Sequence, residues 1–141
     1  MVDVFIPTVL IAGATDKAEA LRKLSVRLFV TETGRQAIEY LRRGRINTVI
    51  SKWELVDIGG GQFLKNVIAA KPGMPTVAIV KAGDDEQEVA ARSIGVSAVL
   101  REDIDDDYFR DIVSQLVTIL GTATADKTAY EIEGVRCVVI N

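Results

Sequence analysis

The chain has 141 residues, of which 48% are hydrophobic and 26% charged, a composition ordinary for one globular domain with a hydrophobic core. The formal charge of −3 argues against nucleic acid as the main partner, because phosphate contacts need clustered Lys and Arg. Histidine, the commonest metal ligand, is absent, and the single cysteine, Cys137, excludes an intramolecular disulfide. No apolar run approaches the roughly 20 residues that cross a bilayer, so we expect a cytoplasmic protein.

Short apolar runs alternate with amphipathic segments along the chain, a pattern that predicts βαβ units and a parallel sheet. Right-handed crossovers then give an α/β fold: a doubly wound, five-stranded parallel sheet in the order 2-1-3-4-5, with helices on both faces. The expected strands are Val9–Ala12, Val26–Val30, Thr48–Lys52, Thr76–Val80 and Ser97–Leu100.

Five helices are expected to follow the strands. Asp16 and Glu19 are a plausible capping pair for the first helix, and Thr33 and Gln36 stand at capping-box spacing for the second. The glycine run at 59–61 indicates a flexible turn before the third. The first helix should end near Leu24, and the second should run from Thr33 to Gly44. The third should lie between Gly61 and Lys71, the fourth between Asp84 and Gly95, and the fifth should extend from Asp106 to Leu120.

The composition changes after Gly121, which predicts a domain over residues 1–120 followed by a separate segment at 121–141. Gly121–Ala129 is interpreted as a linker, and Tyr130–Asn141 as one or two strands. The latter stretch is too apolar to remain in water, and an isolated hairpin is only marginally stable. We expect a homodimer contact made by the helix at 106–120 and this tail, or the start of an output domain that continues beyond Asn141.

The stretch VISKWELVDIGGGQFL, residues 49–64, resembles the third strand and following loop of two-component receiver domains. Chemotaxis receivers come nearest, with V-I-S-D-W-N-M-P-x-M-D-G-x-x-L-L. The resemblance extends from about Val9 to Leu120 and implies a flavodoxin-like fold and a role in signal transduction.

The residues on which receiver phosphorylation depends are replaced. The resemblance implies a carboxylate nucleophile where this chain has Lys52, and a magnesium-binding acidic pair where it has Gly13 and Ala14. An ammonium group cannot form an acyl phosphate, and the latter two residues supply no carboxylate for magnesium. The hydroxyl after strand four, the aromatic switch residue and the lysine after strand five are replaced by Val80, Val99 and Glu102.

These replacements predict a degenerate pseudo-receiver that is not an enzyme and has no metal or cofactor. The family's Asp and Lys are exchanged in sign as Lys52 and Glu102, so we expect these two side chains to lie within bridging reach, directly or through one water. Gly13-Ala14-Thr15 and the glycine run lack the rest of a dinucleotide fingerprint or a P-loop. The Asp84–Asp85 and Asp105–Asp107 groups are interpreted as helix caps rather than metal clusters.

Partner binding then depends on surfaces. Trp53 is either a partner anchor or packing at the rim of the sheet. Tyr108, Val117 and Ile119 widen the apolar stripe of the last helix, which is either ordinary core or part of an interaction face. By resemblance, that face comprises the helix at 84–95, the strand at 97–100 and the helix at 106–120. A protein partner or a homodimer is expected there, with nucleic acid bound only through an output domain beyond Asn141. A further hypothesis, besides the pseudo-receiver and the regulatory domain of a larger protein, is a small-molecule-binding enzyme on the same flavodoxin-like fold.

Overall fold

The computed structural model describes residues 6–128, with side chains described as far as Val117. Five parallel strands form one sheet in the order β2-β1-β3-β4-β5, which confirms the predicted fold class and strand order. The second and fifth strands begin and end one residue later than expected. The strands are β1 (Thr8–Ala12), β2 (Arg27–Thr31), β3 (Thr48–Lys52), β4 (Thr76–Val80) and β5 (Ala98–Arg101).

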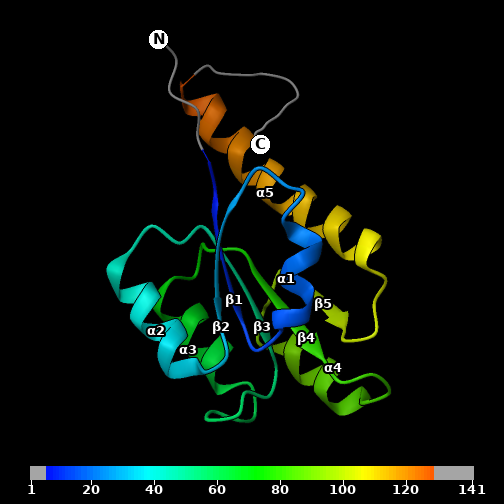
Figure 1. Cartoon of the computed structure of the whole chain (residues 1–141). Helices are drawn as coiled ribbons and strands as arrows, with labels where there is room; N and C mark the ends of the chain where they lie inside the picture. The colour runs from blue at the N-terminus through cyan, green and yellow to red at the C-terminus, as the bar shows by residue number, and fades with distance from the viewer. Residues whose placement is uncertain (1–5, 129–141) are drawn as a thin grey trace.

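Helices cover both faces of the sheet (Figure 1). On one face, α1 (Thr15–Leu21) and α5 (Asp106–Thr128) cover a cluster that includes Val9, Ile11 and Phe109. The opposite face carries a second apolar cluster beneath α2 (Gly34–Arg43), α3 (Gln62–Ala70) and α4 (Asp85–Ser93). Because β1 and β4 are covered on both sides, they are buried along their whole lengths, as their unbroken apolar sequences predict.

The helix starts follow the expected caps at α2 and α4. The hydroxyl of Thr33 accepts a hydrogen bond from the Gln36 amide at 3.1 Å, and the carboxylate of Asp84 accepts one from the Gln87 amide at 3.0 Å. The capping pair expected for α1 is wrong. Its N-cap is Ala14, with no side-chain cap, and Glu19 instead pairs with Arg22 at 2.8 Å, one residue after the helix ends.

Helix α5 is longer than the sequence predicts. It continues to Thr128, so the expected end at Leu120 and the expected linker from Gly121 are wrong for the described residues. A glycine in a helix interior costs only about 1 kcal/mol relative to alanine and does not by itself end a helix. The predicted tail strands and Cys137 lie outside the described residues. No helix among residues 6–128 is long and apolar enough to cross a membrane.

Candidate functional site

The residues singled out from the sequence gather at the carboxyl ends of the strands, as the parallel topology requires. Gly13 follows β1, Lys52 ends β3 and Val80 ends β4. Glu102 follows β5, and its amide donates to the Val80 carbonyl oxygen at 2.8 Å. Ligand sites of open parallel sheets lie beyond this edge, near the point where strand order reverses between β1 and β3. This edge is therefore the candidate site.

The space above Gly13 is filled by aliphatic carbon. Gly13 has a φ of +83°, and a Cβ added to it would lie 2.6 Å from Cδ2 of Leu55 and 3.4 Å from Cβ of Lys52. Leu55 is 7% exposed and belongs to the cluster under α2, α3 and α4. Any side chain at this position would have to displace the Leu55 methyl group and adopt a left-handed backbone conformation.

The neighbouring site positions are apolar and belong to the core. Ala14 and Val80 are each 1% exposed and pack into opposite clusters, on the α1 side and the α4 side respectively. Val99 is partly buried against the cluster that contains Val80. None of these three side chains can donate or accept a hydrogen bond, so they offer a phosphoryl group no partner.

Among the described side chains, Lys52 and Glu102 form no direct ion pair, which was one of the two forms expected, and a bridge through one water stays a prediction. Among the residues with described side chains, no acidic group lies within 4.0 Å of the Lys52 ammonium. The two residues are separated by the whole width of β4, because Lys52 is in register with Ile79 while Glu102 follows β5. Glu102 instead turns toward the loop after β4, where its carboxylate accepts from the Ala82 amide at 3.4 Å.

The residues at this edge do not fit a magnesium ion, which the receiver resemblance implies. Magnesium is held mainly by hard oxygen ligands, and the positions that should supply them carry Gly13, Ala14 and Lys52. The two acids of the loop after β3 are engaged elsewhere: Glu54 accepts from the Gly60 amide, and Asp57 accepts from the amides of Gly34 and Arg35. Within the described part of the chain, no three acidic or Cys side chains gather to hold a metal.

The loop from Trp53 to Gly61 is closely packed. Gly61 has a φ of +72°, and a Cβ added to it would overlap the indole ring of Trp53. The Gly61 amide also donates to the Trp53 carbonyl oxygen at 3.1 Å. Trp53 is 5% exposed, which contradicts its role as an exposed partner anchor and leaves its packing role. Close packing at this turn involves Gly59 and Gly61, whereas a Cβ added at Gly60 would meet nothing within 4 Å, and the flexibility expected of the glycine run stays a prediction.

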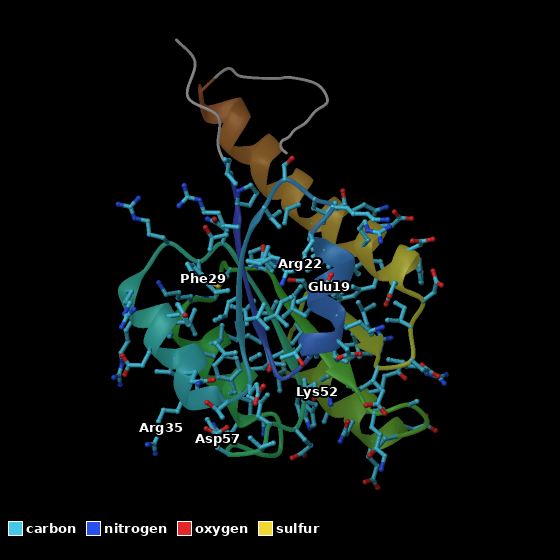
Figure 2. All side chains as sticks on the ribbon, in the orientation of Figure 1. Glu19, Arg22, Phe29, Arg35, Lys52 and Asp57 are labelled. Atoms are coloured by element: carbon cyan, nitrogen blue, oxygen red, sulfur yellow. The ribbon has the colours of Figure 1, made fainter. Side chains whose placement is uncertain are left out.

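Asp57 connects this loop to α2. Its two carboxylate oxygens accept hydrogen bonds from the amides of Gly34 and Arg35, at 2.8 and 3.1 Å. Figure 2 shows Asp57 beside Arg35 at the start of that helix. The bond from the Gly34 amide, followed by the bond from Arg35, holds the pKa of Asp57 below its ordinary value despite some desolvation. The loop is therefore fixed at its outer end by a charge at a helix N-terminus.

The candidate interaction residues on α5 differ in their exposure to solvent. Tyr108 is 60% exposed near the start of the helix, whereas Val117 is 3% exposed and packs into the cluster under α1. The interpretation of Val117 as an interaction residue is thus wrong, and its place in the apolar stripe is ordinary core. Ile119 lies on α5, and its side chain is outside those described.

Three residues that shape the site carried little signal in the sequence. Leu55 and Asp57 stand in a loop whose fold depends on contacts with β1 and α2, so spacing alone does not reveal them. Lys17 is a cation in the first turn of α1, where the helix dipole disfavours it. That anomaly is explained by burial: its ammonium donates to the Ile104 carbonyl oxygen at 2.7 Å and to Asp106 at 3.2 Å.

Solved structures share this architecture. The signal receiver domain of an HD domain-containing protein from Pseudomonas fluorescens Pf-5 superposes with a TM-score of 0.76 at 17% identity, covering 89% of this chain and 97% of that one. The fold is that of a response-regulator receiver domain. The receiver of a putative Luxo repressor protein from Vibrio parahaemolyticus has a TM-score of 0.73 at 19% identity, covering 91% and 100% of the two chains. Vibrio cholerae CheY4 has a TM-score of 0.70 at 14% identity, over 80% and 100%.

Two curated proteins are similar to this chain in sequence. The transcriptional regulatory proteins GlrR of Escherichia coli K12 and QseF of Escherichia coli O157:H7 are each 25% identical over 96 residues, or 68% of this chain. The match spans only 22% of the length of either relative. No protein-family model matches the chain.

Proposed function

We propose that this chain is a pseudo-receiver, a signalling domain that regulates a partner protein through its surface and without phosphorylation. The observation that carries the proposal is the filling of the site by Leu55 and Lys52 above Gly13. Phosphotransfer on a receiver fold needs a carboxylate nucleophile and a cation to balance the phosphoryl charge. Here an ammonium stands at the nucleophile position, and hydrocarbon occupies the space beside it.

The chemical argument concerns both reactants. An amine at Lys52 cannot give an acyl phosphate, and without a metal the negative charge that develops on a transferring phosphoryl group is not neutralised by a divalent ion. The ammonium of Lys52 remains as a positive counter-charge at this edge. Val80 and Val99, however, supply no hydroxyl group and no aromatic ring whose movement would couple a phosphoryl group to α4 and β5. A signal must therefore reach this domain by binding.

The proposed partner surface comprises α4, β5 and α5. Large apolar side chains are exposed on both of its helices: Val89 of α4 is 66% exposed and Tyr108 of α5 is 60% exposed. Exposed aromatic residues of this kind are enriched at protein interfaces. Tyr130–Asn141, by their apolar sequence, are proposed to extend this surface or to contact a second copy.

Exposure to a small-molecule phosphoryl donor tests the proposal. The intact chain is incubated with Mg²⁺ and acetyl phosphate and examined by mass spectrometry, with a phosphorylatable receiver domain treated in parallel. We expect no adduct on this chain and a base-labile adduct on the control. Lys52→Asp is the matched variant. Because it restores only the nucleophile, it should also remain unmodified. A stoichiometric acyl phosphate on the natural chain would falsify the proposal.

A second candidate is the regulatory domain of a longer response regulator. It is favoured by the two curated relatives, which are transcriptional regulatory proteins several times longer than the matched region. In that arrangement the receiver fold controls the assembly of an output domain. The sequence that follows Asn141 in the gene decides it: a DNA-binding or ATPase module there supports this candidate, and a stop codon contradicts it.

A further inference from the structure

The two edges of the sheet differ in what they expose. Edge strands present unpaired backbone groups, and proteins usually protect them with charged or short strands. The β5 edge follows this rule, since it is four residues long and ends in Arg101. The β2 edge does not. Its central residues Phe29 and Val30 are 37% and 38% exposed, and Val30 lies outside both core clusters.

The free hydrogen-bonding groups of β2 can be assigned from its pairing with β1. The Arg27 amide donates to the Pro7 carbonyl oxygen at 2.8 Å, and the Thr31 carbonyl oxygen accepts from the Gly13 amide at 2.9 Å. Odd-numbered residues of β2 therefore direct their backbone groups toward β1. Because backbone direction alternates along a strand, Leu28 and Val30 direct their N–H and C=O groups away from the sheet.

The sequence of β2 is complementary to itself around Phe29. In an antiparallel pair of two β2 strands centred there, Leu28 of each copy lies opposite Val30 of the other. These are the residues with outward backbone groups, so each of the two pairs forms both of its hydrogen bonds. The two Phe29 residues then form the central non-hydrogen-bonded pair, in which side chains approach most closely.

Phe29 is already held in position for such a contact. Its ring stacks on Tyr40 of α2, with centroids 4.6 Å apart and planes inclined by 22°. Figure 2 shows Phe29 between the sheet edge and α2. A two-fold axis perpendicular to the sheet keeps the α2 sides of both copies on one face. The stacked pair of one copy would therefore meet the stacked pair of the other.

Charges at the ends of β2 favour the antiparallel direction. Arg27 at the start and Glu32 just after the end are both exposed. Antiparallel pairing brings Arg27 of one copy opposite Thr31 and next to Glu32 of the other, whereas parallel pairing would bring like charges together. A groove of about 240 Å³ borders this edge, and its lining carries both signs of charge, with Glu39 and Arg43 beside Thr31.

We propose that two copies of this chain associate through β2, antiparallel and centred on Phe29, to form one continuous ten-stranded sheet across a two-fold axis. The seam is short compared with stable interfaces, which bury about 1,200–2,000 Å², so the dimer is weak and depends on concentration. The α4–β5–α5 surface lies at the opposite edge and stays free for a different partner.

Sedimentation of the intact chain over a range of concentrations tests this interface. We expect a monomer–dimer equilibrium in which Val30→Lys, a charge of the kind that protects natural edges, weakens association about tenfold or more. The matched variant Tyr108→Lys places the same charge on α5 and should leave the equilibrium unchanged. Dimerisation lost in Tyr108→Lys and kept in Val30→Lys would place the interface at the other edge and overturn the proposal.

Amide exchange measured by NMR on the unmodified chain provides a readout that needs no variant. The outward amides of Leu28 and Val30 should exchange more slowly as protein concentration rises. Protection that is independent of concentration would mean that another segment of the same chain covers β2. Rapid exchange and a monomer at every concentration would mean that β2 does not pair with a second copy. Either result overturns the proposal.

Discussion

The loops that follow β3 and β4 begin side by side at the same edge of the sheet but are built differently. The first, from Trp53 to Gly61, is closed by two buried side chains and by hydrogen bonds that connect its ends. The second, from Lys81 to Asp84, is open, and a Cβ added at Gly83 would meet nothing within 4 Å. Both contain glycines with positive φ, yet only the first depends on them for space. The closed loop therefore contributes Trp53 and Leu55 to the core, whereas the open loop contributes no fully buried residue.

The largest difference is expected between matched glycine substitutions. Gly61→Ala should lower the free energy of unfolding by about 3 kcal/mol, because it adds a clash with the Trp53 indole to the strain of a left-handed alanine. Gly83→Ala, at a φ of +83°, carries the strain alone and should cost about 1 kcal/mol. Urea unfolding of both variants measures the contrast. Equal losses would show that the indole can move aside.

A smaller effect is expected where the closed loop covers β1. Leu55→Ala removes most of a buried side chain and should lower the free energy of unfolding by about 2–3 kcal/mol. Its neighbour Val56 is 87% exposed, so Val56→Ala should change stability by less than about 0.5 kcal/mol. Thermal and urea unfolding of the two variants provide the comparison. A small effect at Leu55 would mean that the loop is not part of the core.

The smallest effect concerns pH. Because the pKa of Asp57 is lowered in the folded state, its ionised form adds stability above the unfolded value of 3.8, and this is lost as pH falls through the folded pKa. The stability of Asp57→Asn should therefore fall less between neutral pH and about pH 3. Asp103→Asn removes one exposed charge elsewhere and serves as the control. Parallel pH profiles for the natural chain and Asp57→Asn would contradict the assigned cap.

Much of the fold could be predicted from the sequence because strand burial and helix caps are local signals. The unbroken apolar run of β4 and the caps at Thr33 and Asp84 were sufficient to place their elements. The end of α5 could not be predicted, since a single glycine shifts a helix equilibrium only slightly. The capping pair at α1 was wrong because Asp16 and Glu19 have cap spacing, yet the helix follows Ala14 without a side-chain cap.

The candidate site was predicted in part. Parallel strands bring their carboxyl ends to one edge, so the positions of Gly13, Lys52 and Val80 follow from topology alone. The orientation of the side chains at that edge does not follow from topology. Lys52 and Glu102 have opposite charges and stand at the carboxyl ends of β3 and β5, but β4 lies between them. The Glu102 carboxylate instead accepts from the Ala82 amide. The burial of Trp53 could not be predicted from the sequence either, because it depends on the close approach of Gly61 from the far end of the loop.

The buried ammonium of Lys17 has a consequence for synthesis on the ribosome. Its partners, Ile104 and Asp106, lie 87 and 89 residues later in the chain. Phe109, whose ring centroid lies 5.8 Å from the ammonium, arrives later still, as does Val113 of the apolar cluster on this face. A nascent chain that has completed all five strands thus has only α1 over one face of its sheet, and its Lys17 lacks its partners. Exposed apolar surface of this kind is prone to aggregation. We expect productive folding to wait for the last helix, and a chaperone that shields the nascent chain to act in that interval.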